Sequence, residues 1–191
     1  MSLKIALIDS DPERAKALEG QLHGFADVIR VRSGSDFAKI VADAAPDLVI
    51  VDMALPDRDT LEDLRAVAGS HPVVMFAGGG DPGFAEAAIE AGVCSYNLSG
   101  AAVSDIKPIV MSAIALFRRY RRVEVELEET KSRLEERRII ERAKSILMRD
   151  RRMTEPEAYA WLRRKAMNEN RKISVVAAAL IKKEEGNDAK S

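Results

Sequence analysis

Residues 139–167 read IIERAKSILMRDRRMTEPEAYAWLRRKAM, and this stretch decides the fold of the C-terminal third of the chain. Apolar residues recur at the spacing of an amphipathic helix on both sides of residues 149–153, which are polar and strongly basic. Thr154 and Glu157 have the spacing of a capping box, with Pro156 in the first turn, so a new helix should begin here. The stretch therefore predicts two helices joined by a basic turn.

A third helix is predicted downstream. Residues 168–172 form a second polar turn, and Ser174 could cap a short apolar helix over residues 175–183. We expect the three helices to form a bundle that presents both basic turns at one end. Residues 184–191 are predicted to be a disordered tail.

Charge divides the 191-residue chain into an acidic and a basic part. Residues 1–115 carry 9 Lys and Arg against 17 Asp and Glu, whereas residues 142–172 carry 10 against 4. This asymmetry indicates separate tasks for the two parts. On charge alone, the alternative for the basic part is a solvated helical surface without a partner.

Short apolar runs alternate with helical patterns over the first 115 residues. Strands are predicted at residues 3–8, 28–31, 48–51, 73–76 and 94–97, and helices at residues 12–22, 35–44, 60–68 and 82–91. Five apolar strands alternating with helices indicate an α/β domain with a parallel sheet covered on both faces. In such folds the functional residues gather at the carboxyl ends of the strands.

A long helix is predicted to follow this domain, because no glycine or proline occurs between Ile109 and Met153. Over residues 108–141 it should act as a coiled-coil linker, and its apolar residues occupy a and d positions of a heptad. This seam comprises Leu116, Tyr120, Val123, Leu127 and Leu134. It could pack on the chain's own N-terminal domain or on a second copy, and we favour a homodimer.

Three carboxylates are expected to meet at the strand ends. Asp9 and Asp11 follow the first strand, and Asp52 ends the third. Such a pocket could hold a hard cation such as Mg²⁺, with Asp52 as a phosphoryl acceptor. This pattern resembles the receiver domain of two-component response regulators, over about residues 1–120. The resemblance implies a flavodoxin-like fold with strand order 2-1-3-4-5.

The chain departs from the receiver pattern at three positions. Receivers usually carry a second acid where this chain has Ser10, a hydroxyl residue at Ala77 and a lysine at Ser99. Without the hydroxyl and the lysine, a phosphoryl group on Asp52 would lose its main protein partners. We therefore expect an atypical receiver that requires no cofactor and is controlled by a partner protein. A phosphorylation switch at Asp52 is the alternative.

Basic residues near the two turns form the predicted polyanion-binding surface, on which counterion release would give salt-sensitive affinity. The last helix is too apolar to read base edges in duplex DNA, so an RNA loop is favoured. Trp161 is expected to pack in the core. The residues expected to bind RNA are Lys144, Arg149, Arg151, Arg152, Arg163, Asn170, Arg171 and Lys172.

ERAKSILM followed by TEPEAYAWLRRKAM resembles the ANTAR domain of AmiR- and NasR-like antitermination regulators, over residues 135–183. The whole chain, with ALIDSDPERA and VIVDMALPDRDTLEDLRAV, is most similar to the nitrate-responsive NasT group. The resemblance implies binding to a leader RNA with paired hexaloop stem-loops, which prevents formation of a terminator. It also implies control by a NasS-like nitrate/nitrite sensor protein.

Other classes of function have less support. No catalytic set such as Ser/His/Asp is evident, so we do not expect an enzyme. Cys94 is the only cysteine, and no apolar run approaches the roughly 20 residues needed to span a bilayer. We expect a cytoplasmic protein without membrane contact. The alternatives are a DNA-binding response regulator and a scaffold that binds only proteins.

Overall fold

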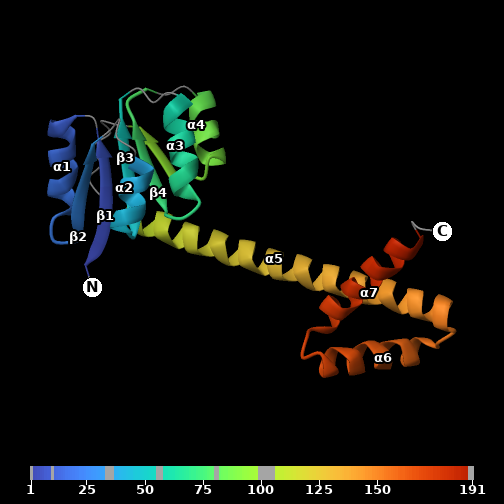
Figure 1. Ribbon diagram of the computed structural model, residues 1–191. Coiled ribbons are helices and arrows are strands. Elements are labelled where there is room, and N and C mark those ends of the chain that lie inside the picture. Colours follow the sequence, from blue (N-terminus) through green and yellow to red (C-terminus); the bar gives the residue numbers. More distant parts are fainter. Residues whose placement is uncertain are drawn as a thin grey trace. The chain divides into compact units, whose positions relative to one another are not determined.

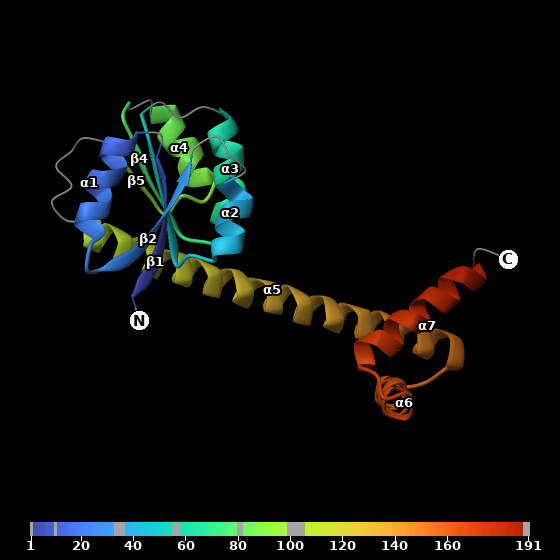
Figure 2. The same ribbon diagram turned by 60° about the vertical axis from the view of Figure 1, so that its left-hand side comes forward.

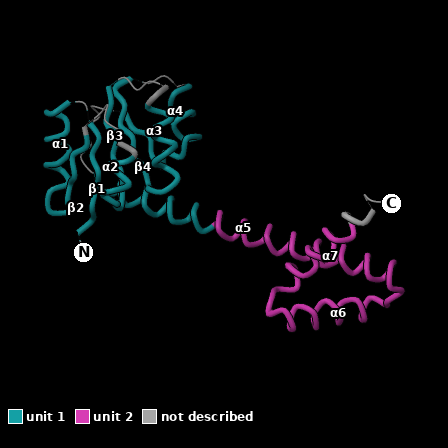
Figure 3. The backbone as a smooth tube through the Cα atoms, in the orientation of Figure 1, with its two compact units in different colours: residues 1–122 teal, residues 123–191 magenta. Residues whose placement is uncertain are grey.

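The computed structural model describes residues 2–9, 11–32, 37–54, 58–79, 82–98 and 106–188. The chain forms two compact units, residues 1–122 and residues 123–191, which Figure 3 shows in two colours. Each unit has its own buried core, so each is described separately.

Unit 1 contains a five-stranded parallel sheet in the order β2-β1-β3-β4-β5. The strands are β1 (Leu3–Asp9), β2 (Ala26–Arg32), β3 (Leu48–Met53), β4 (Val73–Ala77) and β5 (Ser95–Leu98). Every residue of β3 and β4 is buried, as the continuous apolar runs predict for strands that are covered on both faces. The observed strand order is the one that the resemblance to receiver domains implies, so that prediction is confirmed.

Helices cover both faces of this sheet (Figures 1 and 2). Side chains of α1 (Pro12–Leu22) and of the first turns of α5 (Ile106–Arg151) pack on one face. The opposite face is covered by three helices, which are α2 (Phe37–Ala44), α3 (Arg58–Ala68) and α4 (Pro82–Glu90). The result is the flavodoxin-like receiver fold that the resemblance to receiver domains implies.

Helix α5 is continuous over 46 residues. Its first turns bury Val110 and Ala113 in unit 1 and its last turns bury Ala143 and Leu147 in unit 2. All residues of the predicted seam are more than half exposed, with exposed fractions between 52% at Leu116 and 73% at Tyr120. An apolar row this exposed on a helix is typical of a surface that pairs with another helix.

Unit 2 is a three-helix bundle made by the last turns of α5, α6 (Glu155–Asn168) and α7 (Ile173–Asp188). The buried stripe of α6 consists of Ala158, Leu162 and Ala166, which follow one another at four-residue spacing. Its two alanines let the neighbouring helices approach closely. The core closes around Leu147 and Leu162, which are 1% and 0% exposed.

Three expectations about unit 2 were wrong. The two basic turns lie at opposite ends of α6, because successive helices joined by short turns place their connections at alternate ends of a bundle (Figure 1). Ser174 lies inside the first turn of α7 rather than at its cap, because the helix begins at Ile173. Helix α7 also continues to Asp188, into the predicted tail, because Lys and Glu at residues 182–185 favour continuation of a helix already begun.

Among the described residues, no helix combines the length and the apolar character needed to cross a membrane.

Cys94 is a free cysteine, and burial raises the pKa of its thiol. The thiol is therefore held in its neutral form, in agreement with a packing role.

Candidate nucleic-acid interface and acidic pocket

The acidic pocket of unit 1 comprises Asp9, Asp11 and Asp52, together with the side chain of Arg14. Asp9 and Asp52 are neighbours in the register of β1 and β3, and both side chains are buried. Arg14 Nη2 donates a hydrogen bond to Asp9 Oδ1 at 3.1 Å. Arg14 Nε lies 3.9 Å from Asp52 Oδ1 and 3.9 Å from Asp11 Oδ2. One guanidinium thus contacts all three predicted carboxylates.

Two of the three carboxylates, those of Asp9 and Asp11, already have structural roles. Asp11 caps α1, because its Oδ1 accepts a hydrogen bond from the Glu13 N–H at 2.9 Å. The Asp11 N–H in turn donates to Asp9 Oδ1 at 2.7 Å. Burial lowers the pKa of Arg14, but its hydrogen bond to Asp9 and the nearby charges of Asp52 and Asp9 outweigh this effect and raise the pKa overall.

The predicted Mg²⁺ site does not fit this arrangement. Within the described part of the chain, no group of three carboxylate, histidine or cysteine side chains is placed to hold a metal ion. Arg14 was not among the predicted site residues, although its position in the first turn of the helix after Asp9 was a usable signal. Ala77 ends β4 as a buried residue without a hydroxyl. Ser10 and Ser99 lie outside the described residues.

Lys144, one of the residues predicted to bind RNA, lies within the bundle. Its side chain is 8% exposed, and its Nζ donates to Glu155 Oε1 at 2.6 Å and to Glu141 Oε1 at 2.9 Å. These two hydrogen bonds raise the pKa of Lys144, and the bond from Lys144 lowers the pKa of Glu155. Because Glu155 begins α6, the contact fastens α5 to α6. The Lys144 ammonium is therefore buried and paired with two carboxylates within unit 2.

The segment predicted as the first basic turn, residues 149–153, is shorter as a turn, because α5 continues to Arg151 and only Arg152 and Met153 lie outside the helix. The name first basic turn is kept for residues 149–153, which several local contacts hold in place. Arg149 Nε donates to Asp150 Oδ1 at 2.5 Å. The Arg151 guanidinium lies 4.7 Å from the centroid of the Trp161 ring, and Lys165 Nζ lies 5.1 Å from the same centroid. Such cation–π contacts restrict the arginine while leaving its charge exposed. Trp161 is half-buried against the bundle core, so the prediction of core packing is only partly confirmed.

Glu157 also orders this turn, as the capping box predicts. Its Oε2 accepts hydrogen bonds from the Thr154 N–H at 2.8 Å and from the Thr154 hydroxyl at 2.7 Å. These bonds lower the pKa of Glu157. Helix α6 therefore begins at a fixed point directly after the basic turn.

Arg152 has the most unusual backbone of the first basic turn. Its φ is +53°, in the left-handed region that side chains with a Cβ disfavour. The residue is exposed, and among the described residues it has no ion pair. Arg152 directly follows the last residue of α5, where helices commonly end with a left-handed residue that is usually glycine or asparagine.

The second basic turn (residues 168–172) borders a shallow notch of about 560 Å³, lined in part by Arg163, Met167, Asn170 and Arg171. Asn170 also has a positive φ of +51°, which asparagine tolerates well. Arg171 Nη1 lies 3.2 Å from Glu169 Oε2. Lys172 Nζ lies 3.6 Å from Glu136 Oε1, so both cations of this turn have surface partners.

The predicted RNA-binding residues thus fall on two flanks of α6. Positions two apart on a helix are rotated by about 200°. Trp161 and Lys165, which contact Arg151, therefore lie on the flank opposite to Arg163 and Met167, which line the notch. The structure brings together Arg163, Asn170, Arg171 and Lys172, and it separates them from Arg151.

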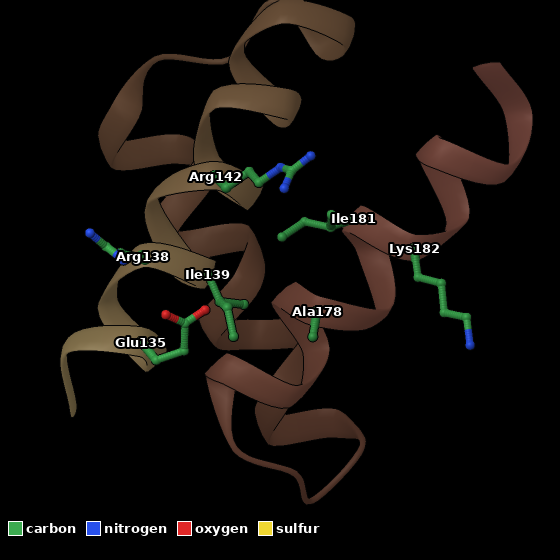
Figure 4. A pocket seen from close by; sticks show the side chains of 7 residues that line it. All are labelled: Glu135, Arg138, Ile139, Arg142, Ala178, Ile181 and Lys182. Carbon is green, nitrogen blue, oxygen red and sulfur yellow. The ribbon is translucent and has the colours of Figure 1, made fainter. Parts of the chain in front are cut away.

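A further open groove of about 620 Å³ lies between α5 and α7. Figure 4 shows Ile139, Ala178 and Ile181 facing this groove, with the Arg142 side chain reaching toward Ile181 and Lys182 directed away. The groove has an apolar floor with cations at its rim. None of the residues predicted to bind RNA lines it.

Comparisons with known proteins agree with both units. Residues 5–98 match the response regulator receiver domain, and residues 128–181 match the ANTAR domain. The transcriptional regulatory protein PdtaR of Mycobacterium tuberculosis is 30% identical over 160 residues, which cover 83% of this chain and 78% of that protein. The nitrate regulatory protein of Klebsiella oxytoca is 43% identical over 56 residues, which cover 29% of this chain and 14% of that protein.

Solved receiver structures show the same fold for unit 1. The signal receiver domain of a modulated diguanylate cyclase from Desulfovibrio desulfuricans gives a TM-score of 0.55 at 20% identity, over 62% of this chain and 98% of that one. A response regulator from Thermotoga maritima gives 0.54 at 17% identity, over 60% and 99%. The chain belongs to the family of response regulators that join a receiver domain to an ANTAR domain. This is a family of regulatory proteins.

Proposed function

We propose that the chain is a transcription antitermination regulator whose unit 2 binds leader RNA. The observation that carries this proposal is the set of exposed arginines in the ANTAR-matched region. Among the described residues, Arg152, Arg163 and Arg164 are exposed and have no ion pair, although acidic residues are plentiful in the chain. Unpaired cations on a rigid bundle attract phosphates and release counterions when they bind.

The shape of unit 2 favours RNA over duplex DNA. Its exposed cations lie in turns and along α6, whereas α7, the last helix, contributes Val176, Leu180 and Ile181 to the core. A helix that reads the major groove presents polar side chains to base edges. Charge at both ends of α6, about 21 Å apart for a helix of 14 residues, suits a folded RNA with unpaired loops. The RNA that we propose is a leader with paired hexaloop stem-loops, whose binding prevents a terminator hairpin.

We further propose a pathway, a controlling partner and an oligomeric state for this regulator. A role in nitrate or nitrite assimilation is supported by the similarity to the nitrate regulatory protein, which is confined to 56 residues. Control by a NasS-like sensor protein is supported by the pocket of unit 1, where Asp52 is buried and Ala77 lacks a hydroxyl. Homodimerisation through the exposed seam of α5 and a cytoplasmic location complete the proposal.

A gel-shift titration tests the central claim. Full-length protein is mixed with a two-stem-loop leader RNA, and duplex DNA of equal length is the competitor. We expect the RNA complex to survive an excess of duplex. Preference for the duplex would refute the proposal in favour of a DNA-binding response regulator. Stoichiometric labelling of Asp52 by acetyl phosphate with Mg²⁺ would instead support control by phosphorylation.

A further inference from the structure

The acidic pocket contains three carboxylates around one guanidinium. The side chains of Asp9 and Asp52 are only 1% and 7% exposed. Carboxylates buried this deeply are destabilising unless a cation compensates their charge. We infer that Arg14 is the resident cation of this pocket and that it excludes divalent metal ions from Asp9 and Asp52.

The position of Arg14 is fixed by the fold. Asp11 caps α1 and so determines where the first turn of the helix begins, which directs Arg14 back toward the strand ends. The guanidinium then reaches a carboxylate oxygen of each acid within 3.9 Å. A divalent cation bonded to the same oxygens would lie about 2.0–2.6 Å from them and could not share this space with the guanidinium.

The hydrogen bonds of Asp9 agree with this competition. Its Oδ1 already accepts from Arg14 Nη2 and from the Asp11 N–H, at 3.1 and 2.7 Å. Its Oδ2 is buried and has no hydrogen-bond partner among the described residues, and the same is true of Arg14 Nε. Arg14 therefore compensates charge without saturating the pocket. Removing the guanidinium would leave oxygen ligands of the kind that Mg²⁺ and Mn²⁺ prefer.

Mn²⁺ titration of the full-length protein, with free Mn²⁺ counted by electron paramagnetic resonance, tests the inference. We expect weak binding to the wild type and at least about tenfold tighter binding to Arg14→Ala, because one positive charge near the ion is lost. Arg14→Lys keeps the charge and should bind Mn²⁺ as weakly as the wild type. Arg65→Ala is the matched control, since it removes an exposed arginine of α3 that lies outside the pocket.

Each possible result of these titrations either supports or overturns the inference. Equal Mn²⁺ affinity of the wild type and Arg14→Ala would overturn the inference, and so would tight binding by the wild type. Circular dichroism establishes whether Arg14→Ala folds. If it folds only when Mg²⁺ or Mn²⁺ is added, the metal has replaced the guanidinium and the inference is supported. If it does not fold in either condition, Arg14→Gln and the wild-type titration decide the question in the same way.

Discussion

The acidic pocket of unit 1 and the first basic turn of unit 2 treat their charged side chains in opposite ways. In the pocket, Asp9 and Asp52 are buried and share the guanidinium of Arg14. In the turn, Arg152 is exposed on a disfavoured backbone and has no ion pair among the described residues. The pocket offsets part of its charge within the chain, whereas the turn leaves the charge of Arg152 without a partner among the described residues. The difference separates charges that stabilise the fold from charges that we propose bind another molecule.

Reversing charge in the first basic turn should have the largest effect. We expect the double variant Arg151→Glu, Arg152→Glu to bind leader RNA about 10- to 100-fold more weakly, because two phosphate contacts become repulsive. The dependence of log K on log salt should also decrease in slope by about 1 to 2. Filter binding at several salt concentrations measures both quantities.

The matched control makes the same change of charge in unit 1. Lys16→Glu with Arg65→Glu alters two exposed cations on α1 and α3. We expect this control to retain nearly all of its RNA affinity. An equal loss in both double variants would mean that net charge, and not the basic turn, governs binding.

A smaller effect should distinguish function from stability at Arg152. Arg152→Gly removes the Cβ from a residue with φ +53° and should stabilise unit 2 by about 1 kcal/mol. The same variant should bind RNA more weakly, because it loses a cation. Urea unfolding and filter binding would show the two changes in opposite directions.

Asn170→Gly provides the reference for this substitution. Asn170 has a similar φ of +51°, which asparagine accepts, so its replacement should change stability by less than about 0.5 kcal/mol. A destabilised Arg152→Gly would show that Arg152 contributes contacts to the fold.

The smallest effect concerns the ion pair that makes Lys144 part of the structure. The pKa of Glu155 is lowered from 4.5 by Lys144, so this pair stabilises unit 2 above that pH and is lost as pH falls through the lowered pKa. At high pH the raised pKa of Lys144 has the corresponding effect, because the stabilisation from this pair is lost as the pH rises through that pKa. Glu155→Gln should therefore lose less stability than the wild type between about pH 5 and pH 3.

Thermal unfolding across this pH range measures the difference. Glu155→Gln should still lose some stability as the pH falls, because Asp150 and Glu157 keep lowered pKa values of their own. Glu128→Gln removes an exposed carboxylate from α5 and serves as the control. If both variants follow the same acid profile, the Lys144–Glu155 pair does not contribute to acid stability.

The spacing of apolar residues predicted most of the helices and strands, because these elements depend on residues that are close together in the sequence. The boundaries of α1 follow from Asp11 as its cap and Pro12 in its first turn, and the structure reproduces them at Pro12–Leu22. The alternation of five apolar runs with helices predicted a parallel sheet, but the order of its strands was implied only by the resemblance to receiver domains, and the structure confirms it. The course of α5 was predictable because nothing in its sequence interrupts a helix.

The partners of charged side chains were harder to predict. Lys144 and Glu141 are three residues apart on one helix, a spacing that could have warned of an ion pair. Glu155 and Asp52, however, reach Lys144 and Arg14 only through the tertiary fold. A sequence reveals that a residue is basic, but whether its charge is available depends on which acids the fold brings beside it.

Trp161 gives the protein an optical property that follows from its neighbours. It is the only tryptophan of the chain, and the charges of Arg151 and Lys165 lie 4.7 and 5.1 Å from the centroid of its ring. The emission of an indole responds to the electric field around it. A phosphate that draws Arg151 away from the ring would change that field, so the unlabelled protein can report by its own fluorescence when the first basic turn is occupied.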